Sequence, residues 1–439
     1  MGKGSKSAPG IVVLVFACLL AVGIAACGGS SESKSETGSP DPAAVSGKIV
    51  VWDCFDKLFP GYTKAVKPLD EAFERAYPNV TVEHVAQPIE SYSQLLRAAF
   101  TGHEGPDVMM MIPGKAGVLQ YTQGLEELND RITPEMSEQL TGWYTMTPGF
   151  ANDGPRYGVP IGATGWNFYY NKKLFVEAGL PREFEPKTWD EVKEAGEKLE
   201  AAGIQPFNGG AEDAAEAGVW FNQGWSTVAT PEQGIELSEG EISFTDEIVN
   251  EALEPLLMVQ EAGLYPSDRF TTPFFTEGYE RFEGEEGAMS LGGWTSAAFW
   301  AEFNPVLGEK NVGIFLPPGS KSVNTSPEYG WSIPSFAKNK EASWAYLEFM
   351  SGKEGIEILA KKGGMLPNRK DVGLPSSFPV QAHELVQWTK ELEPFPEATQ
   401  LVTSTVGETL NKELNQVLQG RLSLDAALES VQEVAEKED

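Results

Sequence analysis

Short apolar runs alternate with stretches that carry apolar residues at helical spacing along residues 48–111. Residues 48–53 (KIVVWD) and 107–111 (DVMMM) are apolar runs of strand length, and residues 80–85 (VTVEHV) alternate apolar and polar positions. Residues 63–77 and 90–101 have the spacing of helices that bury one face. This order of strands and helices predicts a parallel sheet covered by helices.

Ligands of such sheets gather at the carboxyl ends of the strands. The predicted ends lie at residues 52–55, 86–88 and 111–115. These positions are therefore the first candidates for binding residues, and they include Trp52, Asp53 and Pro113.

Residues 157–180 (YGVPIGATGWNFYYNKKLFVEAGL) predict a strand, a loop between glycines at 162–165, an aromatic strand and a short helix. Asn171 fits the N-cap of that helix, and Gly179 fits the left-handed position after its end. The pattern suits an ordinary strand-to-helix joint of an α/β core as well as a joint that lines a ligand.

The later part of the chain also mixes strands and helices. Thr188 and Glu191 are spaced as a capping box. Residues 287–291 predict a short strand, after which two glycines allow a tight turn that places Trp294 at the start of a helix. Further helices are predicted at 246–262, 339–350, 352–361 and from about 379 onward, and further strands at 312–316 and 329–334.

The first residues have the layout of an export signal. Two lysines precede an apolar run at 11–26 that is shorter than the ~20 residues of a membrane-spanning helix. The segment IAAC, which ends at Cys27, resembles the lipobox of bacterial lipoproteins, in which that cysteine is acylated. We therefore expect a signal peptide at 1–26 and a lipidated flexible tether at 27–46. The alternative is a plain secreted protein that is cut near the same place.

Charge and cysteine usage exclude several classes of partner. The net charge is −31, which argues against nucleic acid or an anionic membrane surface as a partner. Cys18 leaves with the signal and Cys27 carries lipid, so Cys54 has no partner for a disulfide and is expected to be a small buried apolar residue. The three histidines are widely spaced, so neither a metal site nor a cofactor is expected.

Short motifs occur in a specific order over nearly the whole mature chain. They are GPDV at 105–108, GLEEL at 124–128, YGVP at 157–160, YYNK at 169–172, AGL at 178–180, TWDE at 188–191, FEGEEGAM at 282–289, GGW at 292–294 and SFAKNKEASWAYLEF at 335–349. With these motifs the chain resembles the extracellular solute-binding proteins of bacterial ABC importers, in particular the sugar-binding group that includes the maltose-binding protein. The lipobox and tether are what this family shows in Gram-positive bacteria.

The resemblance implies an α/β, two-lobed periplasmic-binding-protein type II fold, in which each lobe is a mixed sheet flanked by helices and the ligand binds between the lobes. By that likeness lobe 1 holds residues 47–162 with a return at 313–368, and lobe 2 holds 163–312 with C-terminal helices at 369–439. Residues 162–165 would absorb the dihedral change of closure. The expected function is that of a monomeric, lipid-anchored, non-catalytic protein that captures a mono- or oligosaccharide outside the cytoplasmic membrane and delivers it to a permease.

A sugar ring offers apolar C–H faces that stack on aromatic rings, and hydroxyls that bind amides and carboxylates. The candidate ligand-binding residues are Trp52, Asp53, Pro113, Trp166, Asn167, Asp213, Trp220, Trp294, Trp331 and Arg369. Trp294 matches the family's stacking tryptophan. The other tryptophans suit a core position equally well, and the polar candidates suit capping or surface roles, which is the preferred alternative for Asp213.

Two departures put maltose itself in doubt. Residues 402–409 lack an aromatic that maltose-binding proteins carry, and Ala163 and Thr164 lack a carboxylate at the crossover. Within the binding class, the runner-up ligand is a phosphorylated polyol such as glycerol phosphate, which would need Lys115 and Arg369, or a metal chelate. A secreted glycoside hydrolase is a different class, but no motif singles out its carboxylate pair.

Overall fold

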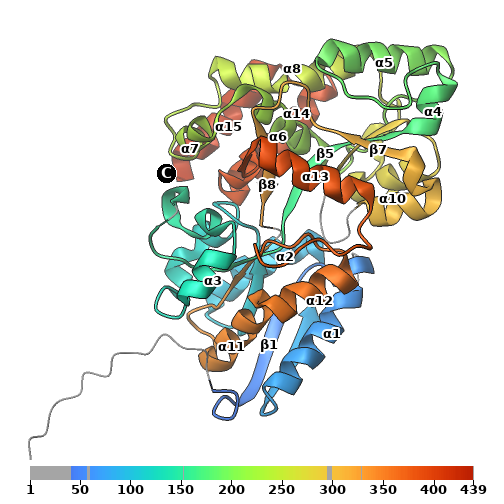
Figure 1. Ribbon diagram of the computed structural model, residues 1–439. Coiled ribbons are helices and arrows are strands. Elements are labelled where there is room, and N and C mark those ends of the chain that lie inside the picture. Colours follow the sequence, from blue (N-terminus) through green and yellow to red (C-terminus); the bar gives the residue numbers. More distant parts are fainter. Residues whose placement is uncertain (1–40, 57–59, 152, 294–298, 328, 439) are drawn as a thin grey trace, which may run out of the picture. The chain divides into compact units, whose positions relative to one another are not determined.

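The computed structural model describes residues 41–56, 60–151, 153–293, 299–327 and 329–438. All of them belong to the compact unit formed by residues 37–439. This unit contains two separate five-stranded sheets with helices packed on them (Figure 1). The first sheet with its helices is called lobe 1 below, and the second is called lobe 2.

The sheet of lobe 1 has the strand order β2-β1-β3-β9-β4. Its strands are β1 (Gly47–Asp53), β2 (Val80–Ala86), β3 (Val108–Met111), β4 (Val159–Ile161) and β9 (Tyr329–Ser332). Strands β1, β2 and β3 are parallel, as the sequence predicts, and β9 runs antiparallel to both β3 and β4. The helices of this lobe are α1 (Pro60–Ala76), α2 (Ile89–Gly102), α3 (Pro134–Gln139), α11 (Lys340–Ser351) and α12 (Lys353–Gly363).

The sheet of lobe 2 is built around β5 (Thr164–Asn171), which pairs antiparallel with three strands. These are β6 (Met289–Gly293), β7 (Val312–Phe315) and β8 (Ser322–Ser326), and β10 (Glu393–Phe395) adds parallel to β8. Asn171 caps α4 (Lys172–Glu177) as predicted, because its Oδ1 accepts the N–H groups of Lys173 and Leu174. Both sheets are therefore mixed.

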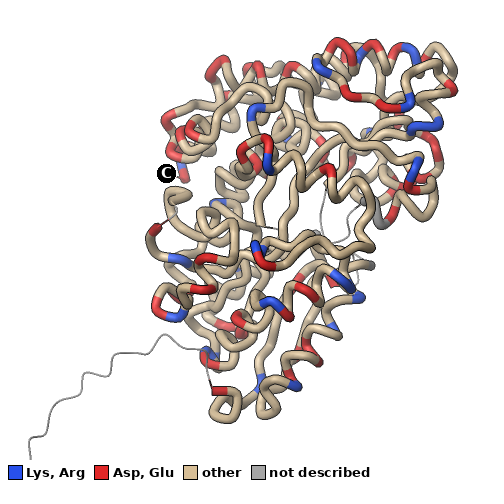
Figure 2. The backbone as a smooth tube through the Cα atoms, in the orientation of Figure 1, with Lys and Arg blue, Asp and Glu red and all other residues tan. Residues whose placement is uncertain are grey.

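Helices surround this second sheet. They are α5 (Trp189–Ala201), α6 (Ala215–Val228), α7 (Pro231–Ser238), α8 (Glu247–Glu261), α9 (Tyr279–Glu283), α10 (Phe299–Leu307), α13 (Val380–Glu391), α14 (Ser404–Leu418) and α15 (Leu424–Glu438). Only half of the predicted capping box forms at α5: the Thr188 hydroxyl accepts the Glu191 N–H at 3.3 Å, whereas the Glu191 carboxylate caps the Lys187 N–H. Figure 2 shows acidic residues spread over the helices of both lobes rather than gathered on one.

The chain passes between the lobes after β4, after β8 and between α12 and α13. Gly162 follows β4 with a φ of 72°, and its N–H donates to Asn368 Oδ1 at 2.9 Å. Strands β7 and β8 pair with β5, so the chain returns to lobe 1 with β9 and not at residue 313 as expected. Arg369 also lies in lobe 1, since its backbone bridges Leu140, so the predicted boundary before 369 is too early.

Candidate functional site

One edge of the lobe 1 sheet faces the crossovers. Parallel strands β1, β2 and β3 end there at Asp53, Ala86 and Met111. Strand β9 begins at the same edge with Tyr329, which pairs with Ile161 at the end of β4. Because Ile161 leads directly into lobe 2, the carboxyl edge of the parallel strands is the edge that faces lobe 2.

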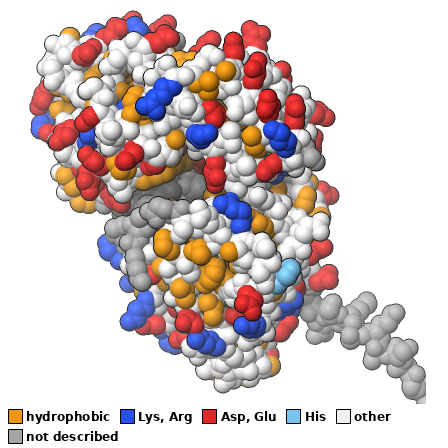
Figure 3. Space-filling view, turned by 180° about the vertical axis from the view of Figure 1, so that it is seen from behind, with side chains coloured by type: hydrophobic (Ala, Val, Ile, Leu, Met, Phe, Trp, Pro, Cys, Tyr) orange, Lys and Arg blue, Asp and Glu red, His pale blue; other side chains and the backbone are white. Residues whose placement is uncertain are grey.

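A matching edge exists in lobe 2. Thr164, at the start of β5, pairs with Ser326 at the end of β8, and Trp166 pairs with Gly293 at the end of β6. The two sheet edges therefore oppose each other across the crossovers. Figure 3 shows the surface hollowed between the two lobes, with apolar side chains along the hollow. This interlobe cleft is the candidate site.

Aromatic and aliphatic side chains stay exposed beside both edges. Ile112, which directly follows β3, is 51% exposed, and Ile89, at the start of α2, is 39% exposed. Phe275 is 46% exposed in lobe 2. The half-buried Trp166 stacks on Phe274 with ring centroids 6.2 Å apart and tilts against Phe275 at the same distance. Exposed rings of this kind form a surface for an apolar ligand face.

A buried polar cluster lies behind Trp166. Glu397 follows β10 and accepts Nδ2 of Asn222 at 3.1 Å. The same Nδ2 donates to Thr399 Oγ1, also at 3.1 Å. Burial raises the pKa of Glu397 to about 8, although a hydrogen bond from Trp166 works in the opposite direction. The cluster is therefore mostly uncharged at neutral pH.

The lobes touch at one side of the cleft in this conformation. The Lys115 N–H donates to the Gln400 carbonyl at 2.8 Å, and Ser404 Oγ donates to Gln120 Oε1 at 3.1 Å. Lys115 Nζ also donates to the carbonyl of Ser238. These contacts join the loop after β3 to lobe 2, so the ends of the two sheets are held close together.

A cavity of about 650 Å³ lies at the crossovers themselves. It is lined from both lobes by residues that include Tyr144, Phe150, Ile235 and Phe395. Trp166 and Phe275 do not line it, so this cavity is distinct from the aromatic surface described above.

Asp53, a predicted ligand-binding residue, makes structural contacts. Its side chain is fully buried, and its Oδ1 accepts the N–H groups of Phe55 and Asp56, both at 2.6 Å. Its Oδ2 lies 2.8 Å from His84 Nε2, a short ion pair whose angles fall outside those of a hydrogen bond. A carboxylate engaged in this way is not free to bind a ligand.

His84 is clamped between two carboxylates. Its Nδ1 lies 3.1 Å from Asp70 Oδ2, while Asp53 contacts the other ring nitrogen. Burial by itself lowers the pKa of His84, but the neighbouring carboxylates of Asp53 and Asp70 outweigh it and raise this pKa to about 9. Tyr346 donates its hydroxyl to Asp70 at 2.6 Å. The imidazolium thus anchors the turn at residues 53–56, which carries Phe55 to the cleft edge.

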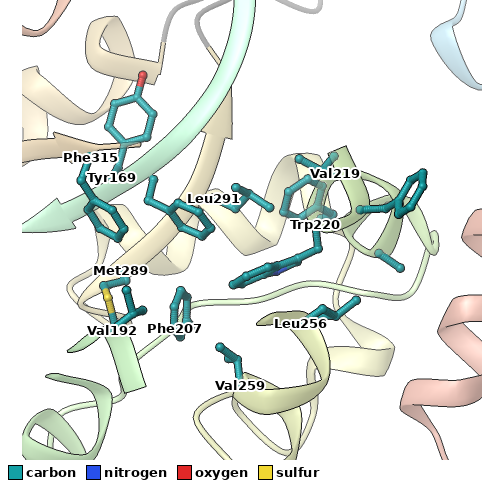
Figure 4. Packing of buried hydrophobic residues seen from close by; sticks show 14 of the residues in the cluster. Tyr169, Val192, Phe207, Val219, Trp220, Leu256, Val259, Met289, Leu291 and Phe315 are labelled. Carbon is teal, nitrogen blue, oxygen red and sulfur yellow. The ribbon is translucent and has the colours of Figure 1, made fainter. Parts of the chain in front are cut away.

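Two predicted tryptophans lie in the cores instead. Trp220 is 1% exposed on α6 and donates its indole N–H to the Tyr265 hydroxyl at 2.6 Å. Figure 4 shows it packed near Phe207 and Leu256. Trp331 is also 1% exposed and belongs to the core of lobe 1. Indole fills large core spaces well, so the core alternative holds for both.

Arg369 is likewise structural. Its side chain is buried, with Nε donating to Asp371 at 2.9 Å and Nη1 to the Ser351 carbonyl at 3.0 Å. Nη2 contacts Glu135. The guanidinium fastens the loop after α12 to α3 and α11, and it faces none of the cleft groups named above.

Asp213 is a capping residue that acts on the aromatic surface. Its Oδ1 accepts the Ala215 N–H at the start of α6, and its Oδ2 accepts the Phe274 N–H at 3.1 Å. It thereby fixes the π-helical turn Phe274–Gly278, which presents Phe275. The capping alternative is thus the observed one.

Replacing Asp213 by alanine is expected to lower the free energy of unfolding by about 1 kcal/mol, because two backbone donors lose their acceptor. Urea unfolding measures this change. The neighbouring exposed Glu212→Ala is the matched control and should leave stability nearly unchanged. Equal losses in the two variants would contradict the capping role.

The remaining predicted residues differ in how deeply they are buried. Trp52 is partly buried against the lobe 1 core, Pro113 is buried, and Asn167 is fully buried with its Nδ2 donating to the Phe168 carbonyl at 2.8 Å. Alternation along β5 places Asn167 on the sheet face opposite to Trp166. Of the predicted set that the structure describes, Trp166 is half-buried and lies beside the exposed Phe275 at the cleft edge of lobe 2.

Two predicted site residues, the stacking Trp294 and the lipidated Cys27, lie outside the described residues, as do the predicted signal peptide and most of the predicted tether. Within the described ranges, no helix has the length and apolar character required to cross a bilayer.

Sequence reasoning missed Phe275, Ile112 and Glu397. Phe275 lies two residues after Pro273, and Ile112 directly follows the buried strand β3. Their exposure, which marks them as site residues, is visible only in the folded structure. Glu397 carries no motif, and its role depends on Asn222, which is 175 positions away.

Comparison with known proteins places these observations in a family. Residues 58–357 match the family model described as bacterial extracellular solute-binding protein. The diacetylchitobiose binding protein DasA of Streptomyces coelicolor is 26% identical over 364 residues, which cover 80% of this chain and 79% of that protein. An uncharacterised ABC transporter extracellular-binding protein of Pyrococcus horikoshii is 26% identical over 313 residues, which are 69% of each chain.

A solved chitin oligosaccharide binding protein shares the fold, with a TM-score of 0.77 and 23% identity over 89% of this chain and 98% of that one. The likeness confirms the expected two-lobed type II architecture.

Proposed function

The chain belongs to the bacterial extracellular solute-binding proteins, and from this premise we propose that it captures a neutral mono- or oligosaccharide in the interlobe cleft and delivers it to the permease of an ABC importer. The observation that carries this proposal is the aromatic surface formed by the half-buried Trp166 and the exposed Phe275 beside a buried polar cluster. A sugar stacks its C–H face on such rings and turns its hydroxyls to amide and carboxyl groups.

The similar proteins support a sugar as the ligand. Two of them are named for chitin-derived oligosaccharides, and both align with most of this chain. Closure of the lobes over the sugar would then signal occupancy, because only a closed form presents both lobes to a permease in a fixed geometry.

A phosphorylated ligand is disfavoured by the cations it would need. Lys115 Nζ is engaged with the Ser238 carbonyl, and Arg369 is engaged with Asp371, Ser351 and Glu135. A phosphate in the cleft would require at least one of them to leave its partners.

Catalysis is not part of the proposal. A glycosidase needs two carboxyl groups that can reach either side of the scissile bond, whereas Asp53 is paired with His84, and Glu397 is buried and accepts a hydrogen bond from Asn222. Asp53 and Glu397 therefore have the contacts of structural residues and not those of a catalytic pair.

The mode of attachment completes the proposal. Cys27 would carry a lipid anchor on the outer face of the cytoplasmic membrane of a Gram-positive bacterium, with 27–46 as the tether of a monomer. Mass spectrometry of the membrane-extracted protein should show the acyl mass on a peptide that begins at Cys27, and a Cys27→Ala variant should be released into the medium.

Isothermal titration calorimetry with the mature protein tests the ligand class. The panel contains glucose, galactose, maltose, xylobiose, cellobiose and diacetylchitobiose, with glycerol 3-phosphate and a tripeptide as controls. We expect saturable binding of at least one neutral sugar with a dissociation constant of about 10 μM or tighter, near −7 kcal/mol. Binding of glycerol 3-phosphate or the peptide, with no sugar bound, would overturn the proposal.

A further inference from the structure

Glu397 holds the edge of the aromatic surface from within lobe 2. Its side chain is only 7% exposed, although glutamate is among the residues that are seldom buried without a partner. The carboxyl group accepts Nδ2 of Asn222 at 3.1 Å and the indole N–H of Trp166. It therefore links Trp166 of β5 to Asn222 in the middle of α6.

Asn222 is itself fixed by several bonds. Its Oδ1 accepts the Thr399 N–H at 3.0 Å, and its carbonyl accepts Nδ2 of Asn324 at 2.8 Å. Asn324 lies on β8, opposite Phe395 of β10. The acceptor that meets Trp166 is thus held by groups from α6, β8 and the turn at Ala398–Gln400.

The Trp166 ring is held on its face as well. Phe274 stacks on it at 6.2 Å with an interplanar angle of 20°, and Asp213 fixes the backbone of Phe274. A ring that is restrained by one stacked neighbour and by one hydrogen bond at its edge has few orientations left. Pre-organisation of this kind raises affinity because less conformational freedom is lost on binding.

We propose that Glu397 is a positioning residue for ligand capture, which holds the Trp166 indole at the angle required for stacking on a sugar ring and does not itself contact the sugar. This inference rests on the proposed function, since it assigns a role within the same cleft. Glu397 acts through Trp166, and Asn222 acts through Glu397.

The charge state of Glu397 defines the appropriate variants. With its pKa raised to about 8 by burial, the group is mostly a neutral acid at pH 7. Glutamine is a close neutral substitute that still offers an oxygen to the indole N–H, whereas leucine has a similar size and no acceptor. Glu397→Gln should therefore preserve the position of Trp166, and Glu397→Leu should release it.

A double-mutant cycle tests the proposal. The affinity for the sugar that binds the wild-type protein is measured for Glu397→Leu, Trp166→Ala and the double variant. Glu397→Leu should weaken binding roughly tenfold. In the Trp166→Ala background the same change should have less than about a twofold further effect, because a residue that acts only through Trp166 is fully coupled to it. Glu397→Gln should bind within about twofold of the wild type.

Glu413→Leu is the matched control, because Glu413 is 8% exposed and lies on α14 with Lys412 and Gln416 as its contacts. It should leave affinity unchanged. Equal binding by Glu397→Leu and the wild type would overturn the inference, as would independent effects of Glu397 and Trp166 or a loss of affinity in Glu397→Gln equal to that in Glu397→Leu.

A second measurement separates this inference from the proposed function. Acrylamide quenching of the ligand-free protein reports on tryptophan exposure, and the part due to Trp166 is obtained by subtracting a Trp166→Phe variant. Glu397→Leu should increase that part, while Glu397→Gln and Glu413→Leu should not. If no sugar binds the wild type, the proposed function fails, yet the quenching result still decides whether Glu397 positions Trp166.

Discussion

Replacing His84 by asparagine is expected to lower the free energy of unfolding by about 3–5 kcal/mol at pH 7, the cost of breaking a buried ion pair and leaving its partner charge buried. The cation is enclosed, with its side chain 8% exposed, and it lies within 3.1 Å of both Asp53 and Asp70. Without it, two acidic groups face each other in the core of lobe 1. Urea unfolding followed by circular dichroism measures the change.

The same cluster predicts a pH dependence with a defined sign. The pKa of His84 is about 9 in the folded protein and about 6.5 in an unfolded chain, so the folded state binds the proton more tightly. Its contribution to stability is therefore complete below about pH 6.5 and is lost as the pH rises through about 9, at up to roughly 1.4 kcal/mol per pH unit. The difference between the wild type and His84→Asn should shrink over this window.

The exposed His383 on α13 supplies the matched control. His383→Asn should change stability by less than about 0.5 kcal/mol, as surface substitutions usually do. If the difference in the free energy of unfolding between the wild type and His84→Asn stays constant from pH 6 to pH 9.5, the imidazole is not held as a cation by the two carboxylates.

The second large effect concerns ligand capture. Trp166→Ala is expected to weaken binding of the captured sugar by about 10- to 100-fold, because a well-packed tryptophan in a contact surface often carries a large share of the binding free energy. Trp166 is half-buried and stacked, so its ring is already placed before the ligand arrives. Trp166→Phe keeps an aromatic face and should lose less affinity.

Titration calorimetry under conditions in which each variant is fully folded separates the loss of affinity from unfolding. Trp388→Ala is a suitable control, because Trp388 is also partly buried against the lobe 2 core but lies on α13. It should leave affinity unchanged. Loss of binding in both variants to the same extent would point to a general weakening of lobe 2 instead of a stacking role for Trp166.

The sequence pattern predicted the secondary structure well where local signals are strong. The parallel strands β1, β2 and β3 and the strand β5 form at the apolar runs of the sequence, because the apolar positions of each run are the ones that the fold buries. Helix α6 was not predicted, because its two glycines at 218 and 224 lower helix propensity. Packing explains them: a Cβ at Gly224 would lie 1.7 Å from the Ala252 carbonyl oxygen.

The binding site was less predictable than the secondary structure, because the type of a residue does not show which side chains it will contact in the folded protein. Trp166 on β5 and Trp220 on α6 are the same residue type, yet Trp166 is half-buried beside Phe275 and Trp220 is buried in the core. Asp53 lies at the predicted strand end but forms an ion pair with His84, which is distant in sequence. Such pairings follow from the tertiary fold alone.

The position of the first strand has a consequence for delivery. Strand β1 begins at Gly47, at the end of the strand opposite to Asp53, so the proposed tether joins lobe 1 at the sheet edge that faces away from the cleft. The proposed lipid on Cys27 would hold lobe 1 within about 25 Å of the membrane, the root-mean-square reach of a Gly/Ser-rich chain as long as residues 27–46. The receptor would then meet a neighbouring permease at an effective concentration on the order of 1 mM. Affinity between the two proteins could therefore be weak without slowing transfer, and the anchored molecule could release its sugar, reload and return without diffusing away.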